Sequence, residues 1–247
     1  MANINDTFFD SGYKDIWKTI IPEQLTEKEV AFMLPYFNLN EGSKVLDLMC
    51  GYGRHAIALA RKGMAATAVD NLAEYIHEIK NTAAKGRLKI NAVQSGVLDF
   101  STDEKFDLAI CMGNSINFFD AADIIRLLKN IHSFLKHGGH LLINSWSLAE
   151  IAIRNFKEKS ESQIGDIKFI TEFQFHFQPA RIEAESTFID KDGKTEIKKG
   201  IDYIFSINEM ESMLKESGFA LKEVYSIPGR KKFTIGEPRA YLVAYKP

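Results

Sequence analysis

Cysteine is scarce in this chain: Cys50 and Cys111 are its two cysteines in 247 residues. Two cysteines cannot build a disulfide framework, and their spacing fits no zinc or iron–sulfur motif, so we expect no disulfide scaffold and no metal site. The sequence also lacks a basic-then-apolar leader and any run of about eighteen apolar residues. We therefore expect a cytoplasmic protein that does not associate with membranes.

An excess of charge of either sign is also missing, since the formal net charge is -2. A broad phosphate-binding surface needs many uncompensated lysines and arginines, so we do not expect a nucleic-acid partner. The hydrophobic content of 45% and the length allow a substantial core without disulfides. A small-molecule ligand is the expected partner, and the sequence leaves the oligomeric state open.

Short apolar strands alternate with helices in the first two thirds of the chain. The helices are expected at 53–62, at 72–84 with Asn71 as its cap, and from Asp120 onward. This alternation predicts a parallel sheet with helices on both faces, the doubly wound α/β class. The strands are expected at 44–49, 64–70, 88–94, 106–112 and 140–146.

The pattern changes at 166–205, where apolar and polar residues alternate with period two. This alternation predicts an antiparallel β insertion of three strands. A capping box at Ser206 then opens a helix, followed by strands at 219–227 and 239–246, and another at Thr26 to Glu29 opens the first clear helix. The chain thus divides into an N-terminal aromatic arm and helix (1–43), a core (44–165 and 206–247) and the insertion (166–205).

Two carboxylates and two glycines follow the first two strands. The first strand carries Asp47 and leads into Gly51 and Gly53 before a helix, and the second strand ends in Asp70. Bare backbone N–H groups at a helix start, beside a carboxylate for ribose hydroxyls, are typical of a site for an adenosine-bearing cofactor.

Asp47 favours S-adenosylmethionine (SAM) over a dinucleotide. A carboxylate four positions before Gly51 would face a pyrophosphate unfavourably, but it suits the ammonium group of a bound amino acid. The alternative role for Asp47 is a helix cap or a buried, hydrogen-bonded carboxylate, and for Asp70 it is the cap of the next helix. Arg54 and His55 are placed to reach the carboxylate end of the cofactor, or to serve the scaffold.

The ordered motifs resemble those of class I SAM-dependent methyltransferases, most of all bacterial small-molecule enzymes with a β insertion before the last helix. The motifs are Leu46–His55, Ala68–Asp70, Phe106–Ile110 and Leu135–His140. The resemblance implies a mostly parallel seven-stranded sheet of order 3-2-1-4-5-7-6 with the last strand antiparallel. It implies that the loop after the first strand holds the methionine part and Asp70 the ribose.

The same resemblance implies where the rest of the cofactor lies. Main-chain groups near Val97 and Leu98 would hold adenine, although Ser95-Gly96 replaces the usual Gly-Asp, which leaves Asp99, a carbonyl or a water for the adenine amino group. The full set of expected SAM contacts comprises Asp47, Cys50, Gly51, Tyr52, Gly53, Arg54, His55, Asp70, Asn71, Val97, Leu98, Asp99, Met112, Gly113 and Asn114.

Methyl transfer from a sulfonium proceeds largely by positioning, so the sequence need not contain a catalytic triad. The candidates for a catalytic role are Asn114, Tyr13 and His176, and those for acceptor binding are Tyr13, Trp17, Asn117 and Trp146. Each has a structural alternative, as a loop, core or surface residue. We expect transfer to N, or O, of a small molecule, with S-adenosylhomocysteine as product. A non-catalytic SAM sensor and an NAD(P)-dependent oxidoreductase are the alternatives.

Overall fold

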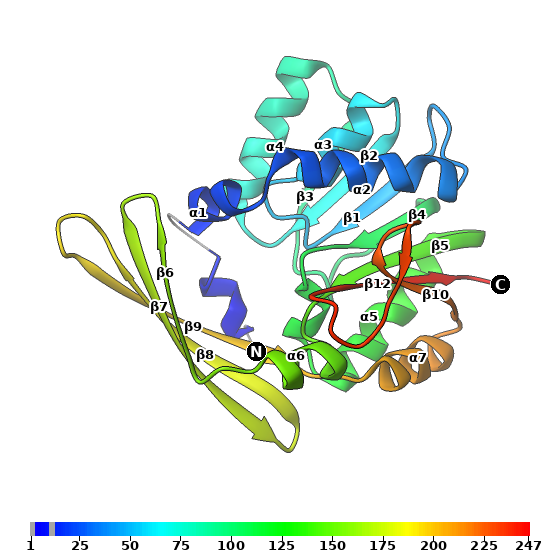
Figure 1. The fold of residues 1–247 in the computed structure, drawn as a ribbon. Helices are drawn as coiled ribbons and strands as arrows, with labels where there is room; N and C mark the ends of the chain where they lie inside the picture. Colours follow the sequence, from blue (N-terminus) through cyan, green and yellow to red (C-terminus); the bar gives the residue numbers. More distant parts are fainter. Residues whose placement is uncertain (1–2, 10–12) are drawn as a thin grey trace.

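The computed structural model describes residues 3–9 and 13–247, without the side chains of residues 13–15 and 17. Its centre is an eight-stranded sheet of order β11-β10-β12-β5-β4-β1-β2-β3 (Figure 1). The predicted order 3-2-1-4-5-7-6 is confirmed, with β12 as the seventh strand and the two-residue β11 added at the edge. The strands are β1 (Lys44–Leu48), β2 (Ala65–Asp70), β3 (Ile90–Gln94), β4 (Phe106–Cys111), β5 (Leu135–Ser145), β10 (Ala220–Ile227), β11 (Lys231–Lys232) and β12 (Ala240–Tyr245).

The direction of β12 decides which residues reach the functional edge of the sheet. Strands β3, β2, β1, β4 and β5 are parallel, whereas β12 runs antiparallel to both β5 and β10. The beginning of β12 therefore lies at the same edge as the carboxyl ends of the parallel strands. Ala240 pairs with Ser145, which places Arg239 at the level of Trp146.

Helices cover both faces of the sheet, which confirms the doubly wound prediction (Figure 1). Residues of α2 (Glu23–Tyr36) and α3 (Arg54–Arg61) pack on one face with Val45, Ile110 and Tyr241. On the same face, α4 (Ala73–Gly86) packs on the alanines of β2 and β3. The opposite face is covered by α5 (Ala121–Phe134) and α7 (Ile207–Glu216).

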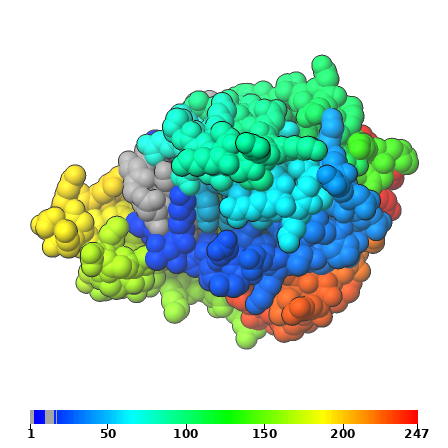
Figure 2. All heavy atoms as spheres, turned by 90° about the horizontal axis from the view of Figure 1, so that it is seen from above, coloured from blue at the N-terminus to red at the C-terminus, as the bar shows by residue number. Residues whose placement is uncertain are grey.

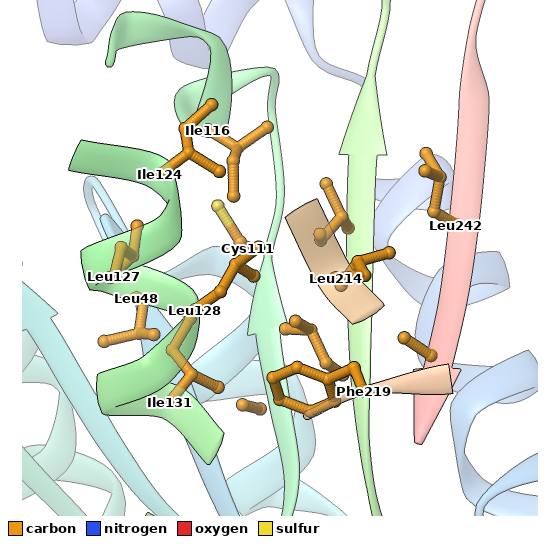
Figure 3. Close-up of a cluster of buried hydrophobic side chains, with 14 of the residues drawn as sticks. Leu48, Cys111, Ile116, Ile124, Leu127, Leu128, Ile131, Leu214, Phe219 and Leu242 are labelled. Carbon is orange, nitrogen blue, oxygen red and sulfur yellow. The ribbon is translucent and has the colours of Figure 1, made fainter. Parts of the chain in front are cut away.

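The largest core cluster lies under α5 and α7. Ile124, Leu127, Leu128 and Ile131 form one stripe of α5 that faces β4 and β5, as the spacing of the apolar residues predicts (Figure 3). Asp120 caps this helix by accepting a hydrogen bond from the Asp123 N–H at 3.0 Å. The predicted capping box at the start of α7 is also present. This well-packed half of the sheet is a rigid base for the loops above it.

The insertion forms a separate antiparallel sheet of four strands instead of the predicted three. These are β6 (Lys159–Ile164), β7 (Ile167–Phe177), β8 (Ala180–Ile189) and β9 (Thr195–Tyr203), and the sheet projects from one side of the domain (Figure 2). The additional strand, β6, pairs with β7 along its whole length. Sequence periodicity misses β6 because it is an edge strand of exposed polar residues, with no apolar face to bury.

The N-terminal segment lies between the insertion sheet and the core (Figure 1). It begins with the short 3-10 helix η1 (Ile4–Thr7) and continues into α1 (Tyr13–Ile20). The side-chain amide of Asn5 donates to the carbonyl of Ile201 and accepts from the N–H of Ile201, both at 2.9 Å. Asn5 thus pairs with β9 as a neighbouring strand would, and fixes the segment to the insertion.

Two predicted helix caps are wrong. Thr26 and Glu29 lie inside α2, which begins at Glu23, and both side chains are buried in a polar cluster described below. Asn71 does not cap α4, since the N-cap is Leu72 and the Asn71 amide donates to Asp6 Oδ1 at 2.7 Å. A capping motif is local, and in both places a partner distant in the sequence takes the side chain instead. Helix α6 (Ala149–Asn155) was not predicted.

Candidate functional site

A cavity of about 280 Å³ opens at the carboxyl edge of the parallel strands. Open α/β sheets bind ligands at this edge, where the strand order reverses between β1 and β4. The loops after β1 to β5 and the segment before β12 line it, together with η1 and the residues that follow α1. The lining includes Asp47, Cys50, Gly51, Tyr52, Arg54, His55, Asp70, Asn71, Val97, Leu98, Asp99, Met112, Gly113, Trp146 and Arg239.

Asp47 places a buried carboxylate in the cavity wall. The residue is 1% exposed, and its Oδ2 accepts a hydrogen bond from the N–H of Ala56 in the first turn of α3 at 3.0 Å. Burial raises the pKa of this carboxyl to about 7, although the Ala56 N–H and the charge of Arg54 favour the ionised form. None of the described residues places a cationic group within ion-pair distance of it. Asp47 thus holds the start of α3, and within the described part of the chain its charge has no counterion.

The loop between β1 and α3 depends on left-handed backbone at Met49 (φ 52°), Gly51 (φ 55°) and Gly53 (φ 77°). A Cβ on Gly51 would meet nothing within 4 Å, and this glycine lines the cavity. A Cβ on Gly53 would lie 2.6 Å from Cγ1 of Ile79 in α4. Gly53 is buried behind the loop and does not line the cavity, so helix packing explains this glycine better than close approach to a ligand.

Asp70 joins two loops at the end of β2. Its Oδ2 accepts from the Gly51 N–H at 2.8 Å, and its Oδ1 accepts from the Leu72 N–H at 3.0 Å. Burial raises the pKa of this carboxyl, against the lowering effect of these N–H groups. Because the side chain still lines the cavity, it is placed to accept hydroxyl hydrogen bonds from a ligand at the strand end.

The expected adenine side is also part of the cavity wall. Val97 and Leu98 line it with Ser95 and Gly96. The Ser95 N–H donates to the Asp70 carbonyl at 2.9 Å, which ties this loop to β2. The side chain of Asp99 is 80% exposed and lies 3.5 Å from the guanidinium of Arg126, so it is open to solvent at the rim.

Behind the loop lies a buried polar cluster that sequence reasoning missed. The carboxylate of Glu29 accepts from Arg54 Nη1 at 2.7 Å, from His55 Nε2 at 2.8 Å and from the Tyr241 hydroxyl at 2.7 Å. Arg54 also donates to the Thr26 hydroxyl at 2.8 Å. The sequence did contain one indication of this cluster. Thr26 and Glu29 lie on the same face of α2 as the apolar Val30 and Met33, whereas a capping box would be exposed.

The charges of this cluster compensate one another. Burial raises the pKa of Glu29, but His55 and Arg54 outweigh burial and hold it at about 2. Burial and the Arg54 charge lower the pKa of His55, so its ring stays neutral and donates from Nε2 to the Glu29 anion. The charge of Arg54 is therefore engaged by Glu29 rather than free for a ligand.

Asn114 and Asn117, expected to act on ligands, are buried and do not line the cavity. Asn114 Oδ1 accepts from the Trp146 N–H at 2.9 Å and the Ser147 N–H at 3.0 Å, while its Nδ2 donates to Ser147 Oγ at 2.9 Å. The amide of Asn117 donates to the Tyr203 carbonyl at 2.8 Å. The catalytic expectation for Asn114 therefore needs correction, because these bonds occupy its amide; it positions Trp146.

The other candidates for the acceptor side differ in whether they line the cavity. Trp146 lines the cavity. His176 lies on β7 of the insertion, away from the cavity lining, and its Nε2 is 3.5 Å from Glu183 Oε2, which argues against a catalytic role. The side chains of Tyr13 and Trp17 lie outside the described residues. Arg239, the η1 residues Asn5 and Asp6, and the N-cap Asn3 line the cavity without having been predicted, since tertiary structure alone brings them there.

Comparison with solved structures identifies the fold. A SAM-dependent methyltransferase from Clostridium acetobutylicum superposes with a TM-score of 0.82 at 20% identity, over 95% of this chain and 96% of that one. CalS10, an amino pentose methyltransferase from Micromonospora echinaspora, superposes with a TM-score of 0.75 at 14% identity, over 96% and 98% of the two chains.

Sequence comparisons also point to methyltransferases. The chain is 28% identical over 248 residues to the putative methyltransferase YqeM of Bacillus subtilis strain 168, covering 97% of this chain and 91% of the relative. Residues 45–139, which contain the loops of the cavity, match the model of a methyltransferase domain. Residues 45–139 thus form a methyltransferase domain, and the fold of the chain is that of class I SAM-dependent methyltransferases. This confirms the expected family and sets the oxidoreductase alternative aside.

The described residues of this methyltransferase include no helix that is long and apolar enough to cross a membrane. The family implies SAM as the methyl donor, and the cavity fits it in one respect that the structure itself shows. No described residue supplies a counterion to the carboxylate of Asp47, and SAM carries an ammonium group that would supply one.

Proposed function

We propose that this methyltransferase transfers the methyl group of SAM to a nitrogen of a small-molecule acceptor bound in the cavity. The observation that carries the proposal is the buried carboxylate of Asp47, which lines the cavity without a described counterion. Transfer to an oxygen is the second candidate. The name of the amino pentose methyltransferase, whose fold matches over nearly the whole chain, supports nitrogen.

Several groups of the chain are placed to hold the cofactor. Asp47 would pair with its ammonium group, the Gly51 loop would approach its methionine part, and Asp70 would accept its ribose hydroxyls. Val97 and Leu98 offer an apolar slot for the adenine ring. SAM supplies a methyl group on a positively charged sulfur, which makes it a reactive donor without further activation.

The contribution of the protein is positioning and exclusion of water. The part of the wall contributed by η1 is fixed to β9 by Asn5. Trp146, held by Asn114, and Met112 line the acceptor side. Holding an acceptor nitrogen in line with the methyl group supplies much of the acceleration of such a displacement, and a shielded site keeps competing water out.

The first test is binding of S-adenosylhomocysteine, SAM and NADH by calorimetry. We expect both adenosyl compounds to bind and NADH not to bind. In Asp47→Asn the dissociation constant of S-adenosylhomocysteine should rise about thirtyfold, equivalent to about 2 kcal/mol for a lost buried ion pair. Asp103→Asn, an exposed matched control, should leave it unchanged. Equal affinity in wild type and Asp47→Asn would refute the assigned role of Asp47.

The second test addresses the acceptor atom. A panel of amines, phenols and carboxylates is incubated with methyl-labelled SAM, and the labelled products are identified by mass spectrometry. Labelled N-methyl products support the proposal. Labelling confined to phenols or carboxylates would replace it with O-methylation.

A further inference from the structure

We infer that Arg239 binds an anionic group of the acceptor, so that the substrate is an amine that also carries a carboxylate or phosphate. This inference rests on the proposed function and specifies the substrate class of the same site.

Arg239 belongs to the acceptor side of the cavity. It precedes β12, and because Ala240 pairs with Ser145, it lies at the level of Trp146, which follows β5. Both residues line the cavity. A half-buried guanidinium in this position is partly removed from water and gains from an anionic partner.

The charge of Arg239 is not balanced by any carboxylate of the described residues. Among the described residues that line the cavity, Arg54 and Arg239 are the two arginines, and none is a lysine. Arg54 is paired with Glu29 at 2.7 Å. Within the described part of the chain, no carboxylate lies at ion-pair distance from Arg239. Arg239 is therefore the cavity arginine that is available to an anion.

The buried cluster beneath the cavity also adjoins this guanidinium. Burial and the Glu29 carboxylate raise the pKa of the Tyr241 hydroxyl, and the neighbouring Arg239 opposes that rise. Tyr241 is itself fixed by its 2.7 Å hydrogen bond to Glu29. A guanidinium has five N–H donors, so contact with one hydroxyl leaves enough for bidentate binding of a carboxylate or phosphate.

The distance from Asp47 favours the acceptor over the cofactor as the partner. Asp47 lies on β1, and Arg239 precedes β12; the three strand spacings along β1-β4-β5-β12 alone separate these two strands by about 14 Å across the sheet. In an amino acid the ammonium nitrogen and the carboxylate carbon are about 2.5 Å apart. A methionine part anchored by Asp47 therefore keeps its own carboxylate near α3, away from the start of β12.

The test measures binding to protein saturated with S-adenosylhomocysteine, in wild type, Arg239→Gln, Arg239→Lys and Arg230→Gln. Arg230 is exposed on the loop before β11, and its variant removes the same charge outside the cavity. The probes are matched triplets: glycine, aminomethylphosphonate and glycinamide; and anthranilate, 2-aminophenylphosphonate and anthranilamide. Calorimetry gives each dissociation constant, and the melting temperature reports whether each variant is folded.

In wild type and Arg230→Gln we expect an anionic member of at least one triplet to bind tenfold or more tightly than its amide. Arg239→Gln should abolish that preference, Arg239→Lys should keep part of it, and S-adenosylhomocysteine affinity should stay within twofold. A carboxylate preferred over the phosphonate identifies a carboxylic acid acceptor, and the reverse identifies a phosphate ester.

Three results would overturn the inference. They are an anion preference that survives in Arg239→Gln, the absence of any anion preference in wild type, and a large loss of S-adenosylhomocysteine affinity in Arg239→Gln, which would assign Arg239 to the cofactor. If wild-type protein binds no adenosyl compound at all, the proposed function fails instead, and the first titration shows this separately.

Discussion

The carboxylate of Glu29 in α2 accepts a 2.7 Å hydrogen bond from the hydroxyl of Tyr241 in β12, 212 positions later in the chain. This bond links the first long helix to the last strand directly beneath the candidate site. Glu29 also bonds Arg54 and His55, which follow the Gly51 loop. The same carboxylate therefore connects this loop with β12, the strand that follows Arg239.

Removal of that hydroxyl tests the link. Tyr241→Phe leaves a buried carboxylate with one donor fewer, and should lower the free energy of unfolding by about 1–3 kcal/mol. Tyr36→Phe is the matched control, because the Tyr36 hydroxyl donates at 2.9 Å to the partly exposed Glu223. We expect the control to lose less than about 1 kcal/mol. Urea unfolding measures the loss of unfolding free energy in both variants. Equal losses would show that the Glu29–Tyr241 bond stabilises the protein no more than the Tyr36–Glu223 bond does.

The affinity for SAM should depend on pH through Asp47. Burial raises the pKa of Asp47 to about 7 in the cofactor-free protein, so the carboxyl is largely protonated at pH 5. An ammonium ligand binds the ionised form, and binding therefore releases a proton below pH 7. Affinity should rise by up to about tenfold per pH unit from pH 5 toward 7 and level off above it. Calorimetry across this range checks the slope, and Asp47→Asn should flatten it; a wild-type affinity that falls toward pH 7 would contradict the argument.

A substitution at Gly53 tests whether this glycine is needed for the packing of the loop against α4. Gly53→Ala adds a Cβ that would lie 2.6 Å from Ile79, at a φ of 77°. Left-handed strain and overpacking together should cost about 2–4 kcal/mol of folding free energy. Gly138→Ala is the matched control, with a φ of 74° and no atom within 4 Å of the added Cβ. It should cost about 1–2 kcal/mol from the backbone alone, and equal losses in the two variants would remove the contact with Ile79 from the explanation.

The docking of the N-terminal segment should affect ligand affinity more than global stability. Asn5→Ala removes both hydrogen bonds to Ile201, and so releases part of the cavity wall. We expect the dissociation constant of S-adenosylhomocysteine to rise about fivefold, equivalent to about 1 kcal/mol, with little change in melting temperature. Thr7→Ala, which removes an exposed local bond to the Ile4 carbonyl, should change neither value. An unchanged affinity in Asn5→Ala would mean that the wall does not depend on this contact.

The sequence predicts the architecture well because the main sheet is built from local, periodic patterns. Each buried strand, such as β1 and β4, is a short apolar run, and each helix beside it carries one apolar stripe. Asp47 and Asp70 are predictable as cavity residues for the same reason, since their place at adjacent strand ends fixes which edge they share.

The remainder depends on contacts that no local pattern encodes. Glu29 satisfies a capping motif in sequence, yet its partners Arg54 and Tyr241 come from other elements. Asn114 follows a strand end, as a ligand-binding residue would, but its left-handed φ of 71° turns its amide toward Ser147. Arg239 belongs to no recognisable motif, and it reaches the cavity because β12 reverses direction.

The position of β12 also shapes how the chain folds as it is made. Residues 240–245 form a strand between β5 and β10, although both of those strands come earlier in the sequence. While these residues are still inside the ribosome, β5 and β10 each have an unpaired edge, the kind of surface that recruits strands from other molecules. The sheet cannot be completed until β12 has emerged, so newly made protein passes through a stage in which chaperones would find exposed strand edges.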